Sequence, residues 1–263
     1  MTSSKLRRVL VLSLTTTAML LSWQRADAAT VLWVEHCGNA HGYPTIQAAI
    51  NAASAGDTVK VCPGIYVENI TINKASLTVV STGGAAVTRI LAAQVAAVVT
   101  ILYPNTTLIG FTLAPAGTTA KYDIGVNVNI GGNANAEIAH NVIRGGRIGV
   151  NLGCGSSGST VYHNVVRGAT ETGINIDTCE IAELPGSTFN SVHHNTVCGG
   201  LYPYSIAGGQ GSDFNSVHHN TARWITFYGD GNIVHNNTAE LFNLWPGDPA
   251  NVTFNNTVAA VCQ

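Results

Sequence analysis

Histidine and asparagine recur along this sequence at positions that could stack into a metal-binding or polar surface. Five histidines directly precede an asparagine, within short segments that resemble one another. Counted at its last asparagine, the segment recurs every 17 to 31 residues, at Asn141, Asn164, Asn195, Asn220, Asn237 and Asn256. A repeat of this length is typical of a solenoid, in which each unit forms one coil and equivalent side chains form columns.

One of these columns contains imidazoles that could ligate a metal ion. His193, His218 and His235 stand two residues before the repeated asparagine in three consecutive repeats. Strand alternation should direct them to solvent, about 4.8 Å apart from coil to coil. Imidazole nitrogen is a ligand for copper and zinc, so these three are candidate metal ligands. The alternative is that the rings stack without a metal.

The repeated asparagines and the histidines directly before four of them are expected to be structural. Asparagine tolerates the left-handed backbone of a tight bend, and stacked amides can hydrogen-bond from coil to coil. The preceding histidines share the strand parity of the inward aliphatic residues, so we expect them to be half-buried at the corner. They are His140, His163, His194 and His219.

A second repeated segment places asparagines on another side of each coil. Its pattern, Gly-[Val/Ile]-Asn-[aliphatic], occurs three times at intervals of 24 residues, starting at Gly125. The aliphatic residues should point inward and the amides outward, where amides can hydrogen-bond sugar hydroxyls. The small Gly153 would leave a depression there. The outward polar residues of this face are Asn127, Asn129, Asn151 and Asn175. A solvated polar face is the alternative.

Acidic residues that could support catalysis are few. A polysaccharide lyase needs a base beside a group that neutralises a carboxylate, often calcium held by several acids, and a hydrolase needs paired carboxylates. Near the asparagine face the sequence offers Asp177 and Glu180. With Arg147 they are the candidate catalytic residues, and calcium is the cofactor that a lyase would use.

The first 28 residues are expected to be a secretory signal peptide. Basic residues at 5, 7 and 8 precede an apolar stretch and a small-x-small site at 26–28. Removal of this segment takes away four of the 12 basic and one of the 14 acidic residues, which leaves a net charge of about −5. We therefore expect a secreted or periplasmic monomer, with residues 29–263 as one domain and neither nucleic acid nor a membrane as a partner.

All six cysteines follow the signal segment, and an even count in an exported chain favours disulfides. Cys154 and Cys179 follow equivalent segments at nearly the same offset, so they should lie on adjacent coils and pair. Cys37 and Cys62 both end strand-like runs near the start of the domain. The remaining pair, Cys198 with Cys262, follows by elimination.

The elements that must position these residues are short strands. Residues 46, 49, 50 and 53 follow the period of an amphipathic helix, which suits a cap over the open end of a solenoid. Beyond it come β-rich runs separated by Gly, Pro, Asn or Ser. Coils with two or three short strands each describe an all-β, single-stranded parallel β-helix.

The segments 45–53, 56–61 and 63–72 resemble the entry segment of the pectin-lyase-like superfamily of right-handed β-helix proteins. The later Gly-[Val/Ile]-Asn and His-Asn units resemble that family's coil repeats, so the resemblance covers nearly all of the domain. It implies a saccharide groove on the strand face that carries Asn151, which makes Asn127, Asn129, Asn151 and Asn175 the candidate polysaccharide-binding residues. It does not imply one activity, because the superfamily includes lyases, hydrolases, esterases, epimerases and non-catalytic proteins.

The sequence lacks the catalytic motifs of the polygalacturonases, pectin esterases and pectate lyases in that superfamily. The resemblance therefore favours a secreted protein that engages an acidic extracellular polysaccharide, with lyase-like cleavage as a further expectation. The competing interpretation is a non-catalytic periplasmic or surface protein, either structural or handling copper through its histidine column.

Overall fold

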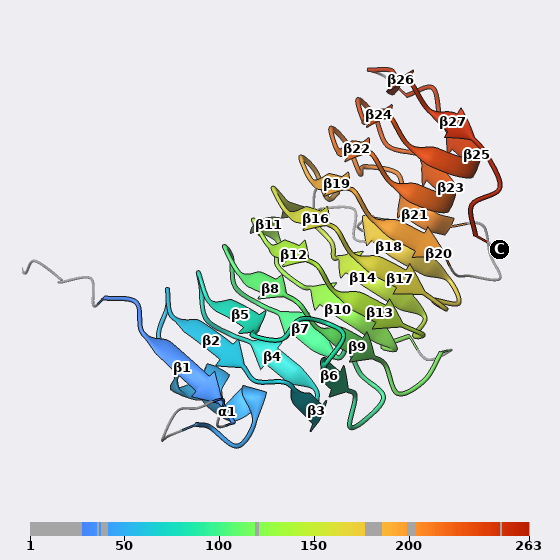
Figure 1. Cartoon of the computed structure of the whole chain (residues 1–263). Coiled ribbons are helices and arrows are strands. Elements are labelled where there is room, and N and C mark those ends of the chain that lie inside the picture. Colours follow the sequence, from blue (N-terminus) through green and yellow to red (C-terminus); the bar gives the residue numbers. More distant parts are fainter. Residues whose placement is uncertain are drawn as a thin grey trace, which may run out of the picture.

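The computed structural model describes residues 28–35, 37, 42–118, 121–176, 186–198, 204–247 and 249–262. Its strands stack in parallel from coil to coil, in one sheet of 10 strands and one of 15. Figure 1 shows these coils rising from β1 and α1 at one end to β26 and β27 at the other. The chain is therefore a parallel β-helix, as predicted.

The first sheet, called sheet A here, takes one strand from each coil. Its strands are β1 (Val31–Val34), β2 (Thr58–Val61), β5 (Thr78–Ser81), β8 (Thr107–Ile109), β12 (Glu137–Ala139), β16 (Thr160–Tyr162), β19 (Ser191–His193), β22 (Ser216–His218), β24 (Ile233–His235) and β26 (Val252–Phe254).

The second sheet consists of two series of strands, B1 and B2, which β23 (Thr221–Phe227) and β25 (Thr238–Leu244) join because each runs through both. Series B1 contains β3 (Gly64–Val67), β6 (Thr88–Leu91), β9 (Thr112–Ala114), β13 (Val142–Arg144), β17 (Val165–Arg167), β20 (Thr196–Cys198) and, beyond β25, β27 (Thr257–Val258). Series B2 contains β4 (Ile70–Ile72), β7 (Val99–Ile101), β10 (Ile124–Val128), β14 (Ile148–Leu152), β18 (Thr172–Ile176) and β21 (Tyr204–Gly208). A small separate sheet pairs β11 (Gly132–Asn133) with β15 (Ser156–Ser157).

The core is a set of aliphatic columns. In sheet A, Val161, Val192, Val217 and Val234 lie in register on consecutive coils and are fully buried. β-branched side chains suit this position because they fill a pleated, buried surface with few rotamers to lose. The prediction that these residues point inward is confirmed.

The helix α1 (Ile46–Ala52) covers the first coil. The Thr45 hydroxyl accepts a hydrogen bond from the Ala48 backbone N–H at 3.0 Å, which caps the helix start. Ile46, Ala49 and Ile50 are buried, and the helix packs against β1, β2 and β4. The predicted end cap is confirmed, since this apolar stripe keeps water from the first coil.

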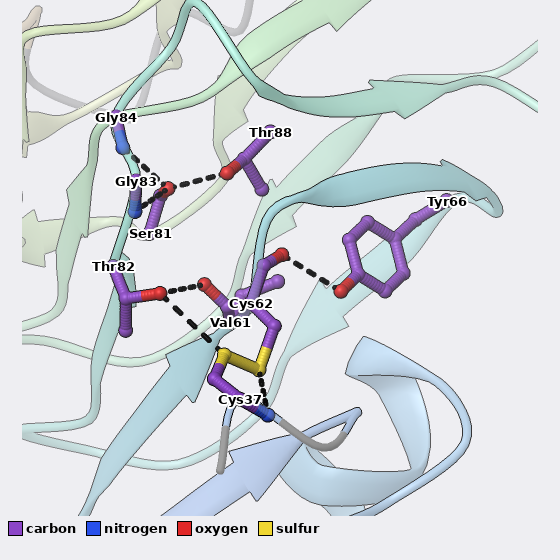
Figure 2. The surroundings of a disulfide bond; sticks show 9 residues. All are labelled: Cys37, Val61, Cys62, Tyr66, Ser81, Thr82, Gly83, Gly84 and Thr88. Carbon is purple, nitrogen blue, oxygen red and sulfur yellow. Dashed lines mark hydrogen bonds between the residues drawn. A yellow bond between two sulfur atoms is a disulfide. The ribbon is translucent and has the colours of Figure 1, made fainter.

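Disulfides tie both ends of the described chain to the coil stack. Cys37 is bonded to Cys62, and Figure 2 shows this bond next to Thr82 of the following coil, while the Tyr66 hydroxyl donates to the Cys62 carbonyl oxygen at 2.8 Å. Cys198 is bonded to Cys262, with 5.4 Å between their Cα atoms. Both pairings are confirmed.

The third predicted pairing involves a cysteine outside the described residues. Cys154 is disulfide-bonded, but Cys179 is not among the residues that the structure describes. The pair Cys154–Cys179 therefore stays a prediction.

A buried amide ladder connects the coils at the bend between sheet A and series B1. Asn195 is typical: its Nδ2 donates to the Val161 carbonyl and to Asn220 Oδ1, at 2.8 and 3.0 Å. Its own Oδ1 accepts from the backbone N–H of Asn164 at 2.9 Å. The predicted hydrogen bonds from coil to coil are confirmed.

Two predictions for this bend are wrong: which residue is left-handed, and that the histidines are half-buried. The left-handed residue is the histidine and not the asparagine, with φ of 52° at His163 and 55° at His194. These histidines are exposed, while the following asparagines, such as Asn195, are about 1% exposed. A left-handed residue turns the chain, so the inward–outward alternation of the preceding strand does not continue through it.

Sequence reasoning missed a second amide ladder at the corner where sheet A begins. It contains Asn190, Asn215, Asn232 and Asn251, each of which accepts a hydrogen bond on Oδ1 from a backbone N–H of the preceding coil. The signal was present, because Phe-Asn-Ser-Val occurs at both 189–192 and 214–217.

Candidate functional site

The predicted asparagine face lies on series B2. Asn127, Asn151 and Asn175 are in register on β10, β14 and β18. Asn151 Nδ2 donates to Asn127 Oδ1 at 3.0 Å, and Asn175 Nδ2 donates to Asn151 Oδ1 at 2.8 Å. The structure therefore brings these three candidate residues together as a row of oriented amides.

The glycines of the repeated segment allow these strands to pack closely against the next coil and against series B1. A Cβ on Gly125 would lie 2.5 Å from the Gly149 carbonyl oxygen and 2.6 Å from Ile143 Cγ2. Gly149 and Gly173 are crowded in the same way by aliphatic side chains of series B1. Glycine is therefore required by close packing, and this packing sets the direction of the amides two residues later.

Access to the asparagine row is uneven. Asn127 and Asn175 are half-buried and Asn129 is exposed, but Asn151 is only 8% exposed. Gly153 does not form the expected depression. A Cβ there would lie 2.6 Å from the Val128 carbonyl oxygen, so this glycine permits a close backbone approach between coils.

Arg147 is not free to meet a substrate carboxylate. It lies at the turn before β14, where it forms an ion pair with Glu171 of the next coil. Its Nη2 also donates to the Lys121 carbonyl oxygen at 3.2 Å. The arrangement holds three coils together at this turn. Asp177 and Glu180, the other candidate catalytic residues, lie outside the described residues, beyond the far end of β18.

Two arginines at the end of series B1 have no carboxylate partner among the described residues. Arg144 and Arg167 are exposed and in register on β13 and β17. The ion pairs of the described chain are Arg147–Glu171 and Arg223–Glu240, and neither includes these two guanidinium groups. Like charges directly opposite on adjacent strands repel, so this pair favours an anion between or above them.

The histidines form a ridge along the edge of sheet A, which we call the histidine ridge. Its inner column stacks Tyr162, His193, His218, His235 and Phe254, with ring centroids 4.6 to 5.2 Å apart. Its outer column contains His140, His163, His194 and His219, with ring centroids 4.9 to 5.0 Å apart and a tilt of 37° between His163 and His194. The inner histidines are half-buried and the outer ones exposed.

The two columns are hydrogen-bonded to each other in two coils. Nδ1 of His193 lies 3.0 Å from Nδ1 of His194, and the same distance separates Nδ1 of His218 from Nδ1 of His219. One nitrogen of each pair must therefore carry the proton that the other accepts.

Burial and neighbouring imidazoles favour the neutral form in the middle of the ridge. Desolvation by burial and the adjacent histidines lower the pKa of His193 and His194 from the ordinary value, and lower that of His218 to about 4. At one end of the inner column, the Tyr162 hydroxyl donates to the Glu137 carboxylate at 2.5 Å. This hydrogen bond raises the pKa of Tyr162 to about 12.

The predicted metal ligands lie in one column but do not converge. The rings of His193 and His218 are 5° from parallel, so their lone pairs run side by side. Among the described residues, no group of three His, Cys, Asp or Glu side chains is placed to hold a metal ion, whether calcium, copper or zinc. A single ion bound by His193, His218 and His235 together would need these rings to leave the stack.

Comparisons with known proteins support the fold. No protein-family model and no curated protein matched the sequence. The chain is similar to an alginate lyase from Paenibacillus sp. str. FPU-7, with a TM-score of 0.65 and 13% identity over 80% of this chain and 76% of that one. It is also similar to pectate lyase Pel9A, with a TM-score of 0.58 and 13% identity over 90% of this chain and 79% of that one.

The Agl-KA catalytic domain is also similar, with a TM-score of 0.54 and 16% identity over 74% of this chain and 44% of that domain. These likenesses confirm the right-handed parallel β-helix that the sequence resemblance predicted.

Proposed function

We propose that the protein binds an acidic polysaccharide along the asparagine face of series B2. The observation that carries this proposal is the hydrogen-bonded row of Asn127, Asn151 and Asn175. Each amide has two N–H donors and two acceptor lone pairs, and each contact within the row uses one of each. The groups that remain at Asn127 and Asn175 are held in fixed directions and can bind sugar hydroxyls.

The acidic character of the proposed ligand is supported by charge. Arg144 and Arg167 lie at the turns that lead from series B1 to series B2, and neither is neutralised by a described carboxylate. Guanidinium binds carboxylates in a bidentate geometry, so two of them in register suit a polymer with repeated carboxylates. Two of the similar structures are lyases named for alginate and pectate, which are polymers of this kind.

The disulfides support action outside the cytosol. Cys37–Cys62 and Cys198–Cys262 would be stable in an oxidising compartment, in agreement with the signal peptide proposed for residues 1–28. Among the described residues, no helix has the length and apolar character needed to span a membrane.

Binding is tested by titrating alginate, polygalacturonate and a neutral glucan into the protein by calorimetry. We expect heat with the acidic polymers, and a loss of affinity of about tenfold or more in the variant Asn127→Ala/Asn175→Ala. Asn243→Ala is the matched control, because Asn243 lies in the same register column but is separated from Asn175 by Ala207 and by the buried Thr226. Equal affinity in the double variant and the wild type would refute the asparagine face as the binding site.

Cleavage is a separate question for the same polymers. Lyase chemistry would release unsaturated ends that absorb in the ultraviolet, and we propose Asp177 and Glu180 as the groups that would carry it. Loss of this product in Asp177→Asn with binding retained would support that role. Binding without any product from wild-type protein would limit the function to recognition.

A further inference from the structure

The His193–His194 and His218–His219 pairs differ from the rest of the histidine ridge. In these two coils the inner and outer columns both carry histidine, and their Nδ1 atoms lie 3.0 Å apart. In the other coils one partner is missing, because Tyr162 precedes His163 and Asn236 follows His235. Each of these two coils therefore holds two nitrogen atoms, close together, that could ligate a metal ion.

The separation of these nitrogens suits a chelated metal ion. With metal–nitrogen bonds of about 2.0–2.1 Å, two nitrogens 3.0 Å apart subtend about 95° at the ion. This angle is close to the roughly 90° between neighbouring ligands of a tetragonal copper site. One Nδ1 of each pair now carries the proton that the other accepts, so this proton has to leave, and each ring has to turn until its lone pair points at an ion beside the N–N line.

We propose that the histidine ridge holds two adjacent sites for a first-row divalent transition metal ion, one at His193–His194 and one at His218–His219. Each pair supplies two Nδ1 ligands, and water supplies the rest. The proton that now lies between the two nitrogens has to move to Nε2 of the same ring, so both imidazoles stay neutral and no net proton is lost. Among the divalent ions, Cu²⁺ binds more tightly than Zn²⁺.

Stacking between the two coils supports these sites, because it holds the four rings in place. The ring centroids of His193 and His218 lie 4.8 Å apart, and those of His194 and His219 lie 4.9 Å apart. His235 lies one coil beyond the second pair, with its ring stacked on that of His218 and 5.0 Å between their centroids. Because it would have to leave this stack to reach the ion, it is not a ligand of either site.

The test is a calorimetric titration of metal-free protein with CuCl₂ and with ZnCl₂, supported by the electron paramagnetic resonance of bound Cu²⁺. We expect about two equivalents of Cu²⁺ bound through nitrogen, and weaker Zn²⁺ binding. His194→Asn and His219→Asn should each remove one equivalent. Asparagine is the suitable replacement because Asn236 and Asn255 occupy the same left-handed position in the next two coils.

The matched control is His140→Asn/His163→Asn, which removes two imidazoles of the same column that have no paired Nδ1. It should leave both equivalents bound. The proposal is overturned if His194→Asn/His219→Asn still binds two equivalents, or if the control loses as much as that double variant. Melting temperatures without metal show whether each variant is folded.

Discussion

At the scale of single residues, Asn195 shows how one polar side chain holds three coils. Its amide contacts the coil before it through the Val161 carbonyl and the backbone N–H of Asn164, and the coil after it through Asn220. All of these groups are buried, where an unpaired donor or acceptor costs about 1–3 kcal/mol.

Replacement of Asn195 by alanine should therefore lower the free energy of unfolding by about 2–4 kcal/mol, because several buried partners lose their hydrogen bonds at once. Chemical denaturation measures the loss. Asn133→Ala is the control, since Asn133 is exposed, and it should change stability by less than about 0.5 kcal/mol. If the two variants lose similar amounts of unfolding free energy, the buried amide ladder does not stabilise the coil stack as proposed.

The protonation of His218 makes the stability of the folded chain depend on pH. Burial and adjacent imidazoles lower its pKa from 6.5 to about 4, so the unfolded chain binds more protons than the folded one between these values. Stability from this group is present above pH 6.5 and is lost as pH falls toward 4. Because the ring is partly exposed and solvent screens its interactions, we expect His218 to contribute about 1–2 kcal/mol to the free energy of unfolding.

The melting temperature of metal-free protein should thus fall between pH 7 and pH 4.5, and the fall should be smaller in His218→Gln. Differential scanning calorimetry in the presence of a chelator measures both slopes. The same slope in variant and wild type would show that this imidazole is not the group responsible.

At the scale of elements, glycine allows β10, β14 and β18 to pack closely against series B1. Gly125→Ala would place a methyl group 2.6 Å from Ile143 Cγ2, so it should lower stability by about 2–3 kcal/mol. Gly131→Ala is a matched control six residues away, because a Cβ there meets nothing within 4 Å. If both variants have the same melting temperature, steric crowding does not explain why glycine recurs at Gly125, Gly149 and Gly173.

At the scale of the whole molecule, each coil contacts mainly its neighbours, so stability is expected to be local along the axis. The Cys198–Cys262 bond returns the described C-terminal segment to a coil 64 residues earlier. Cys262→Ser should therefore speed amide hydrogen exchange in β25 and β27 and leave β2 and β5 unchanged. Cys37→Ser/Cys62→Ser should give the opposite pattern, and uniform acceleration in either variant would mean that the coils unfold as one unit.

The sequence by itself determined the β-helix, the end cap and the columns. Asn141 and its equivalents recur at coil-length intervals, and valines alternate with polar residues on short strands, which leaves few other ways to bury the apolar side chains. The Cys37–Cys62 disulfide followed from the same reasoning, because strands that stack bring their ends together, whereas Cys198–Cys262 followed by elimination.

The tertiary structure alone decided which way side chains point at the bends and which of them have partners. Counting alternate residues placed His194 inward, but its left-handed backbone turns the chain and buries Asn195 instead. The sequence placed Arg147 among the candidate catalytic residues, but in the structure it forms an ion pair with Glu171. Alternation is a local property of extended backbone, whereas bends and contacts between coils depend on residues 20 or more positions away, as the separation of 24 between Arg147 and Glu171 shows.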